Sequence, residues 1–96
     1  MDSSEILLKL KNYKEKASSE YKVKRIGLFG SYARGEGTEE SDIDIVIELD
    51  APDLFKLVHI KEELERLFGK HVDIIRSRNN MNPFLKKQIE KNVLYV

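Results

Sequence analysis

The spacing of hydrophobic positions divides the chain into helices and strands. Near its start, apolar residues recur every three or four positions, which is typical of a helix with one buried face. These residues are Ile6, Leu7, Leu10, Tyr13 and Ala17. Ser3 or Ser4 is available to cap the first free amides of this helix. Residues 23–29, VKRIGLF, are rich in β-forming side chains and stop at Gly30, so a strand is expected there.

The segment DIDIVIEL, residues 42–49, alternates with a period of two, which predicts a second strand. One face of this strand would carry Ile43, Ile45, Ile47 and Leu49. The other face would carry Asp42, Asp44, Val46 and Glu48. Two carboxylates therefore lie at the start of an otherwise apolar strand.

A second helix is predicted to open at Pro52 and Asp53 and to stop at Gly69. Its broad apolar stripe, which should cover one face of the sheet, consists of Leu54, Leu57, Val58, Ile60, Leu64, Leu67 and Phe68. HVDII, residues 71–75, reads as a third short strand, and Asp73 interrupts its apolar run. A polar turn, RSRNNMN, follows over residues 76–82.

Pro83 suits the first turn of a last helix that carries Phe84, Leu85 and Ile89, and residues 93–96 are again β-prone. The resulting order predicts an α/β fold with a small mixed β-sheet packed with helices. The link between the first two strands has only 12 residues, which favours an antiparallel pair. At 96 residues, one domain spanning 1–96 is expected.

Composition indicates which partners and which cellular location to expect for this domain. Seventeen basic residues balance seventeen acidic ones, so there is no strong nucleic-acid signal. The chain has no cysteine, no signal-peptide pattern and no run of 18 apolar residues. We therefore expect a cytoplasmic protein with no membrane segment.

The two carboxylates of the second strand suggest metal chemistry. Asp42 and Asp44 should point the same way, with Cβ atoms roughly 6 to 7 Å apart. Such a pair can share two Mg²⁺ ions, which take hard oxygen ligands and promote in-line phosphoryl displacement. Asp73 is the candidate third ligand, because an unpaired charge among apolar residues would be costly and a metal would remove that cost. Asp42, Asp44 and Asp73 are thus the predicted catalytic and metal-binding residues.

The loop after the first strand offers groups that can bind phosphate. Gly30 and Ser31 follow the first predicted strand and precede a predicted helical turn, an arrangement that directs backbone amides at an anion. Arg34 would contact phosphate or pair with a nearby acid. The glycine spacing resembles a P-loop, but Glu36 stands where that motif requires lysine.

A plain structural explanation of the carboxylates remains open. Asp42 would then end the loop, Asp44 would face solvent, and Asp73 would pair with His71 or a lysine. His71 itself, like His59, is given no functional role because neither has a matching metal-ligand spacing.

The segment GSYARGEGTEESDID resembles the signature of polymerase-β-like nucleotidyltransferases, in which GS is followed by ten residues and then Asp-x-Asp. Asp73 in HVDII resembles the third aspartate of that family. The opening helix, the DIDIVIEL strand and the closing KKQIEKNVLYV also resemble the small members called minimal nucleotidyltransferases.

This resemblance implies a function and a partner. Some minimal nucleotidyltransferases are antitoxins that transfer AMP from ATP to a tyrosine of a HEPN-domain RNase toxin. The family pattern implies two metal ions on Asp42 and Asp44, with Asp73 completing one site and Gly30 and Ser31 holding the triphosphate. Two other readings stay open: a binding module that neutralises its partner by occlusion, and nucleotide transfer to a small molecule or an RNA end.

Overall fold

A mixed β-sheet forms the centre of the fold in the computed structural model, which describes residues 1–78 and 81–96. The elements of the described residues are, in chain order, α1 (Ser3–Tyr21), β1 (Val23–Phe29), α2 (Gly30–Ala33), β2 (Ile43–Leu49), α3 (Leu54–Phe68), β3 (Val72–Ser77), α4 (Pro83–Asn92) and β4 (Leu94–Tyr95). The predicted α/β architecture is confirmed. In the turn predicted for 76–82, residues 76 and 77 instead continue β3, and residues 79 and 80 lie outside the described residues.

Strand order within the sheet is β3-β2-β1-β4. β1 is antiparallel to β2 and to β4, whereas β2 and β3 run parallel. The short link between β1 and β2 joins an antiparallel pair, as predicted, while α3 supplies the crossover between the parallel strands β2 and β3. Because β2 and β3 are parallel, the first residues of both strands lie at the same end of the sheet.

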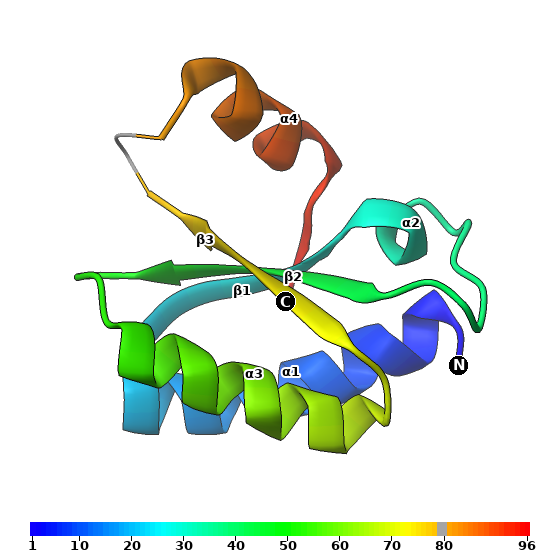
Figure 1. The fold of residues 1–96 in the computed structure, drawn as a ribbon, viewed down its shortest axis with the longest axis horizontal. Helices are drawn as coiled ribbons and strands as arrows, with labels where there is room; N and C mark the ends of the chain where they lie inside the picture. Colours follow the sequence, from blue (N-terminus) through cyan, green and yellow to red (C-terminus); the bar gives the residue numbers. More distant parts are fainter. Residues whose placement is uncertain (79–80) are drawn as a thin grey trace.

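One face of the sheet is covered by α1 and α3, as Figure 1 shows. The predicted alternation of β2 is confirmed, because Ile43, Ile45, Ile47 and Leu49 are all buried in the core under these helices. Fully burying each large aliphatic side chain contributes about 1.5 to 3 kcal/mol, so this apolar layer dominates the stability of the fold.

The stripe predicted for the second helix is wider than the face that α3 buries. Ile60, Leu64 and Phe68 are buried, but Leu54 and Val58 are exposed. Successive residues are rotated by about 100° around a helix, so these two positions lie outside the arc that faces the sheet.

The opposite face of the sheet is covered in part by α4 (Figure 1). Ile89 is the buried residue of this helix, whereas Phe84 and Leu85, the other two apolar residues noted in its sequence, are exposed. Val46 on this face of β2 is fully buried, while Asp44 is only half-buried. The part of this face near the start of β2 therefore remains accessible.

Most helix ends agree with the sequence signals, including Pro83 in the first turn of α4. Asp53 caps α3 by accepting from the Lys56 amide at 3.1 Å, and Gly69 ends α3 with a φ of 65°. The serine cap predicted for the first helix is wrong. Asp2 fills that role, since its carboxylate accepts from the Glu5 amide at 2.9 Å. Among the described helices, none combines the length and the apolar character that crossing a membrane would need.

A polar cluster centred on Glu63 joins α1 to α3. Its Oε1 atom accepts hydrogen bonds from the hydroxyls of Tyr13 at 2.9 Å and Tyr21 at 2.7 Å, and Lys16 pairs with Oε2. Burial would raise the pKa of Glu63, but the hydrogen bonds from Lys16, Tyr21 and Tyr13 outweigh it and lower that pKa below its usual value. The cluster fixes the two helices against each other on the side of the sheet that lacks the predicted site residues.

Candidate active site

The antiparallel pairing of β1 and β2 brings the glycine-serine pair next to the aspartates. Phe29, the last residue of β1, lies opposite Asp44, so Gly30 follows directly at the same end of β2. Gly30 has a φ of 73°, and a Cβ built on it would overlap Oδ2 of Asp44 and lie 3.1 Å from its Cγ. A residue with a side chain would be strained here and would push the Asp44 carboxylate aside, so this position favours glycine.

The parallel pairing of β2 and β3 brings in the third aspartate. Asp44 lies directly beside Asp73, and the Ile43 amide donates to the His71 carbonyl at 3.1 Å. Side chains alternate along a strand, so Asp42 and Asp44 share a face with His71 and Asp73. The structure thus brings together three aspartates that the sequence separates by up to 31 positions.

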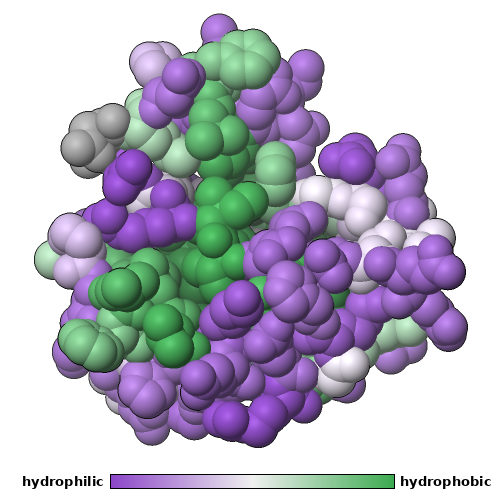
Figure 2. Space-filling view, in the orientation of Figure 1, coloured by the Kyte–Doolittle hydropathy of each residue, from purple (hydrophilic) through white to green (hydrophobic). Residues whose placement is uncertain are grey.

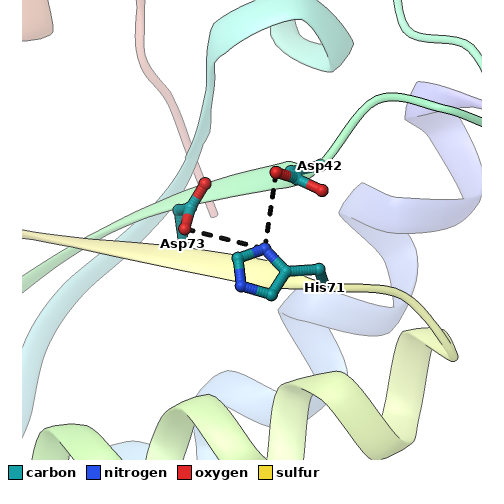
Figure 3. A group of neighbouring side chains, drawn as sticks. All are labelled: Asp42, His71 and Asp73. Atoms are coloured by element: carbon teal, nitrogen blue, oxygen red, sulfur yellow. Dashed lines mark ion pairs between the residues drawn. The ribbon is translucent and has the colours of Figure 1, made fainter.

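His71 lies in the site, although the sequence analysis gave it no functional role and named it only as an alternative partner of Asp73. Its Nδ1 atom lies 3.4 Å from Oδ2 of Asp42 and 3.7 Å from Oδ1 of Asp73, as Figure 3 shows. One ligand atom from each of these three residues lies within 4.8 Å of the other two. The available signal was the spacing of two between His71 and Asp73, which places both side chains on one face of a strand.

The burial argument made for Asp73 is wrong. Half of the Asp73 side chain is exposed, and the exposed fractions of Asp42 and His71 are similar. The reason is position, because β3 is an edge strand and Asp73 lies near its start. An exposed carboxylate does not demand a metal to offset burial, so the case for a metal rests on the geometry of the group.

Asp44 carries the strongest electrostatic perturbation of the site. Burial raises the pKa of Asp44, and the nearby charges of Asp73 and Asp42 raise it further. Arg34 and His71 act in the opposite direction without cancelling the effect. Repulsion of this kind among carboxylates is relieved when a cation binds between them.

The loop between β1 and β2 is held by its own hydrogen bonds. The hydroxyl of buried Tyr32 donates to the Thr38 carbonyl at 2.6 Å, and the Ser3 hydroxyl donates to the Tyr32 carbonyl. Ser31 lies in the short α2 and is partly exposed. These contacts fix the loop beside the start of β2, and among the described residues the Ser31 hydroxyl has no hydrogen-bond partner.

Arg34 follows one of the two alternatives predicted for it. Its Nε atom lies 3.2 Å from Oε2 of Glu36, so it pairs with an acid of its own loop. Both side chains are exposed, and an exposed pair of this kind is weak enough to exchange for a phosphate. The phosphate contact of Arg34 stays a prediction.

The donor set fits a divalent cation. Carboxylate oxygens are the ligands that Mg²⁺ prefers, and imidazole nitrogen is accepted by transition metals. Oxygen atoms of Asp42 and Asp73 lie within 4.8 Å of each other, so these two carboxylates are placed to share an ion. Asp44 lies directly beside Asp73 in the parallel pair, next to that position. The open face in front of them leaves room for substrate phosphates and water, which normally complete such a coordination shell.

Comparison with known proteins gives consistent matches. The nucleotidyltransferase domain family matches residues 10–96. A protein named protein adenylyltransferase from Methanocaldococcus jannaschii is 47% identical over 96 residues, which covers 97% of this chain and 96% of the relative. The protein adenylyltransferase MntA of Thermococcus cleftensis is 36% identical over 85 residues, which covers 88% of this chain and 85% of the relative.

Solved structures with the same fold include a minimal nucleotidyltransferase, with a TM-score of 0.80 and 30% identity over 98% of this chain and 95% of the other. A toxin-antitoxin structure with AMP-PNP has a TM-score of 0.70 and 23% identity, and it covers 99% of this chain and 72% of the other. This second match is a likeness of fold.

Proposed function

This chain belongs to the nucleotidyltransferase domain family, and from that membership we propose that it transfers AMP from ATP to a hydroxyl group of a partner protein. The single observation that carries this proposal is that Gly30, Asp44 and Asp73 lie together at one end of the strands. The protein acceptor is supported by relatives named protein adenylyltransferase that are up to 47% identical to this chain.

In this proposal the site residues have separate tasks. Asp42, Asp44 and Asp73 would hold two Mg²⁺ ions, which when bound would neutralise charge on the triphosphate. The backbone of Gly30 and the hydroxyl of Ser31 would bind phosphate oxygens, with Arg34 released from Glu36 to assist. We assign the whole of 1–96 to this one domain.

The transfer itself forms one bond and breaks one. The acceptor oxygen attacks the α-phosphorus of ATP, and the bond from that phosphorus to the oxygen bridging to the β-phosphorus breaks. Pyrophosphate leaves with that bonding pair, and the acceptor proton passes to the carboxylate of Asp73, which lies at the open edge of the site.

For the partner, we propose a HEPN-domain toxin that the chain silences as an antitoxin, in the cytoplasm. Support comes from the shared name MntA, which belongs both to a relative 36% identical to this chain and to a toxin-antitoxin complex of the same fold. The HEPN identity rests on the resemblance of the GS and Asp-x-Asp motifs alone.

An exposed apolar surface also supports a protein partner. The side chains of Phe55 on α3 and Phe84 on α4 are 81% and 72% exposed. Figure 2 shows hydrophobic residues gathered in a band that runs from α4 across the sheet towards α3. Exposed apolar patches of this kind mark surfaces where proteins associate.

The test is the mass of the partner after co-expression. Wild-type chain should add the mass of AMP to a hydroxyl-bearing residue of the toxin, and the Asp42→Asn, Asp44→Asn double variant should not. Asp50→Asn is the matched control, because Asp50 follows β2 at its other end and pairs with Lys24 at 2.9 Å. If the toxin is neutralised without any gain of mass, the chain acts by occlusion instead.

A further inference from the structure

We propose that His71 is a metal ligand, so that Asp42, His71 and Asp73 form a mixed nitrogen and oxygen site for a first-row transition-metal dication such as Mn²⁺. The proposal deepens the proposed function, because it uses two of the carboxylates assigned to the metal there. It adds a third ligand and a metal preference that the aspartates alone would not give.

The distances at His71 are those of ligands that share an ion. Two ligand atoms that each lie about 2.1 Å from one ion are separated by roughly 2.9 to 4.2 Å, depending on the angle between them. Nδ1 of His71 lies 3.4 Å from Asp42 and 3.7 Å from Asp73, within that interval. Figure 3 shows the imidazole edge directed at both carboxylates at once.

A direct ion pair explains the same distances less well. A charge-assisted hydrogen bond between nitrogen and oxygen is about 2.7 to 2.9 Å long, and both contacts of Nδ1 exceed that length. The imidazole is therefore within ion-pair distance of two carboxylates but makes a short hydrogen bond to neither. All three side chains are about half exposed, so small rotations around an entering ion cost little.

The backbone holds His71 in this place. Its carbonyl accepts from the Ile43 amide at 3.1 Å, and the next amide, that of Val72, donates to Oε2 of Glu65 at 3.1 Å. The first of these bonds ties the approach to β3 to the start of β2, and the second ties it to α3. The imidazole is thus presented from a fixed strand end, which is what a metal ligand requires.

A nitrogen ligand changes which metal the site favours. Mg²⁺ takes oxygen ligands, whereas the affinity of mixed nitrogen and oxygen sites for first-row dications rises from Mn²⁺ towards Cu²⁺. Replacing His71 should therefore weaken binding of Mn²⁺ while leaving that of Mg²⁺ almost unchanged.

The experiment is binding of Mn²⁺ alone, without nucleotide, followed by electron paramagnetic resonance. Bound Mn²⁺ in the wild type should show electron spin-echo modulation from a directly coordinated imidazole nitrogen. His71→Asn should lose this modulation and bind Mn²⁺ about tenfold more weakly or worse, with affinity for Mg²⁺ within about twofold of wild type. His59→Asn is the matched control, because His59 is exposed on α3, and it should behave as wild type.

Absence of nitrogen modulation in the wild type, or unchanged Mn²⁺ affinity in His71→Asn, would overturn the proposal. The wild-type spectrum needs no variant, so misfolding cannot obscure the result. The outcome is also separate from the proposed function, because a nitrogen-ligated Mn²⁺ in a chain that transfers no AMP would contradict the function and leave the ligand assignment standing.

Discussion

Gly30 and Asp44 meet across the ends of two antiparallel strands, and a Cβ on Gly30 would overlap Oδ2 of Asp44. This contact places the first residue of the proposed phosphate-binding pair beside the second aspartate of the Asp-x-Asp motif. The glycine leaves space for the Asp44 carboxylate.

Replacement of Gly30 by alanine should abolish transfer by displacing Asp44. We expect a loss of roughly a hundredfold or more in the rate of AMP transfer, because a shift of about 1 Å in a catalytic group has that effect. The control is Gly35→Ala, since Gly35 has a φ of 74° but no atom within 4 Å of its Cβ position. Each variant should lose about 1 to 2 kcal/mol of stability to the left-handed backbone. Equal transfer rates in the two variants would show that the contact with Asp44 is unimportant.

Asp44→Asn should stabilise the metal-free protein at neutral pH. The pKa of Asp44 is raised in the folded state by burial and by Asp73 and Asp42, so folding disfavours its charged form. The resulting loss in the free energy of unfolding is absent below the pKa that Asp44 has in the unfolded chain. It develops as the pH rises through the raised pKa of the folded state, and it persists at pH 7. With screening by solvent, we expect a gain of at most about 1 kcal/mol in the free energy of unfolding, measured by urea titration. The gain should vanish as the pH falls below about 4, and a loss of stability at pH 7 would refute this explanation.

Short-range patterns in the sequence predicted much of the fold and indicated the aspartates as candidate site residues. The alternation of Ile43, Ile45 and Ile47 predicts their burial correctly, because every second strand residue faces the same way. The exposure of Asp73 did not follow, since it depends on β3 being the edge strand, which is a property of the whole sheet. The position of His71 beside Asp42 did not follow either, because Asp42 immediately precedes β2 whereas His71 immediately precedes β3.

Glu63→Gln should destabilise the fold in a pH-dependent way. The charged carboxylate accepts from Tyr13, Tyr21 and Lys16, so its loss should cost about 1 to 3 kcal/mol at pH 7. Because the pKa of Glu63 is lowered in the folded state, its contribution is complete above the unfolded value and is lost as the pH falls through the folded value. In thermal unfolding, the stability difference between wild type and Glu63→Gln should be large at pH 7 and small at about pH 3. Glu62→Gln, at an exposed neighbouring position, should leave the stability unchanged at both pH values. If Glu63→Gln remained as destabilising at about pH 3 as at pH 7, the charged carboxylate would not be the source of the stabilisation.

Phe55→Ser combined with Phe84→Ser should weaken binding of the partner without destabilising the chain. Both rings are largely exposed, so the free energy of unfolding should change by less than about 0.5 kcal/mol per substitution. Loss of two apolar anchors should weaken the partner's affinity about tenfold or more in isothermal titration calorimetry. Leu8→Ser on α1 is the control, because Leu8 is 62% exposed but lies on a different helix. Unchanged affinity in the double variant would place the partner elsewhere.

The most direct test of the central claim compares ATP labelled at the α-phosphate with ATP labelled at the γ-phosphate, each incubated with the chain, Mg²⁺ and its partner. The proposed reaction predicts that α-label enters the partner and γ-label does not, because AMP is retained and pyrophosphate leaves. Asp50→Asn should label as wild type does, and Asp42→Asn with Asp44→Asn should give no label. Entry of γ-label, or equal α-labelling in the double variant, would contradict nucleotide transfer by these aspartates.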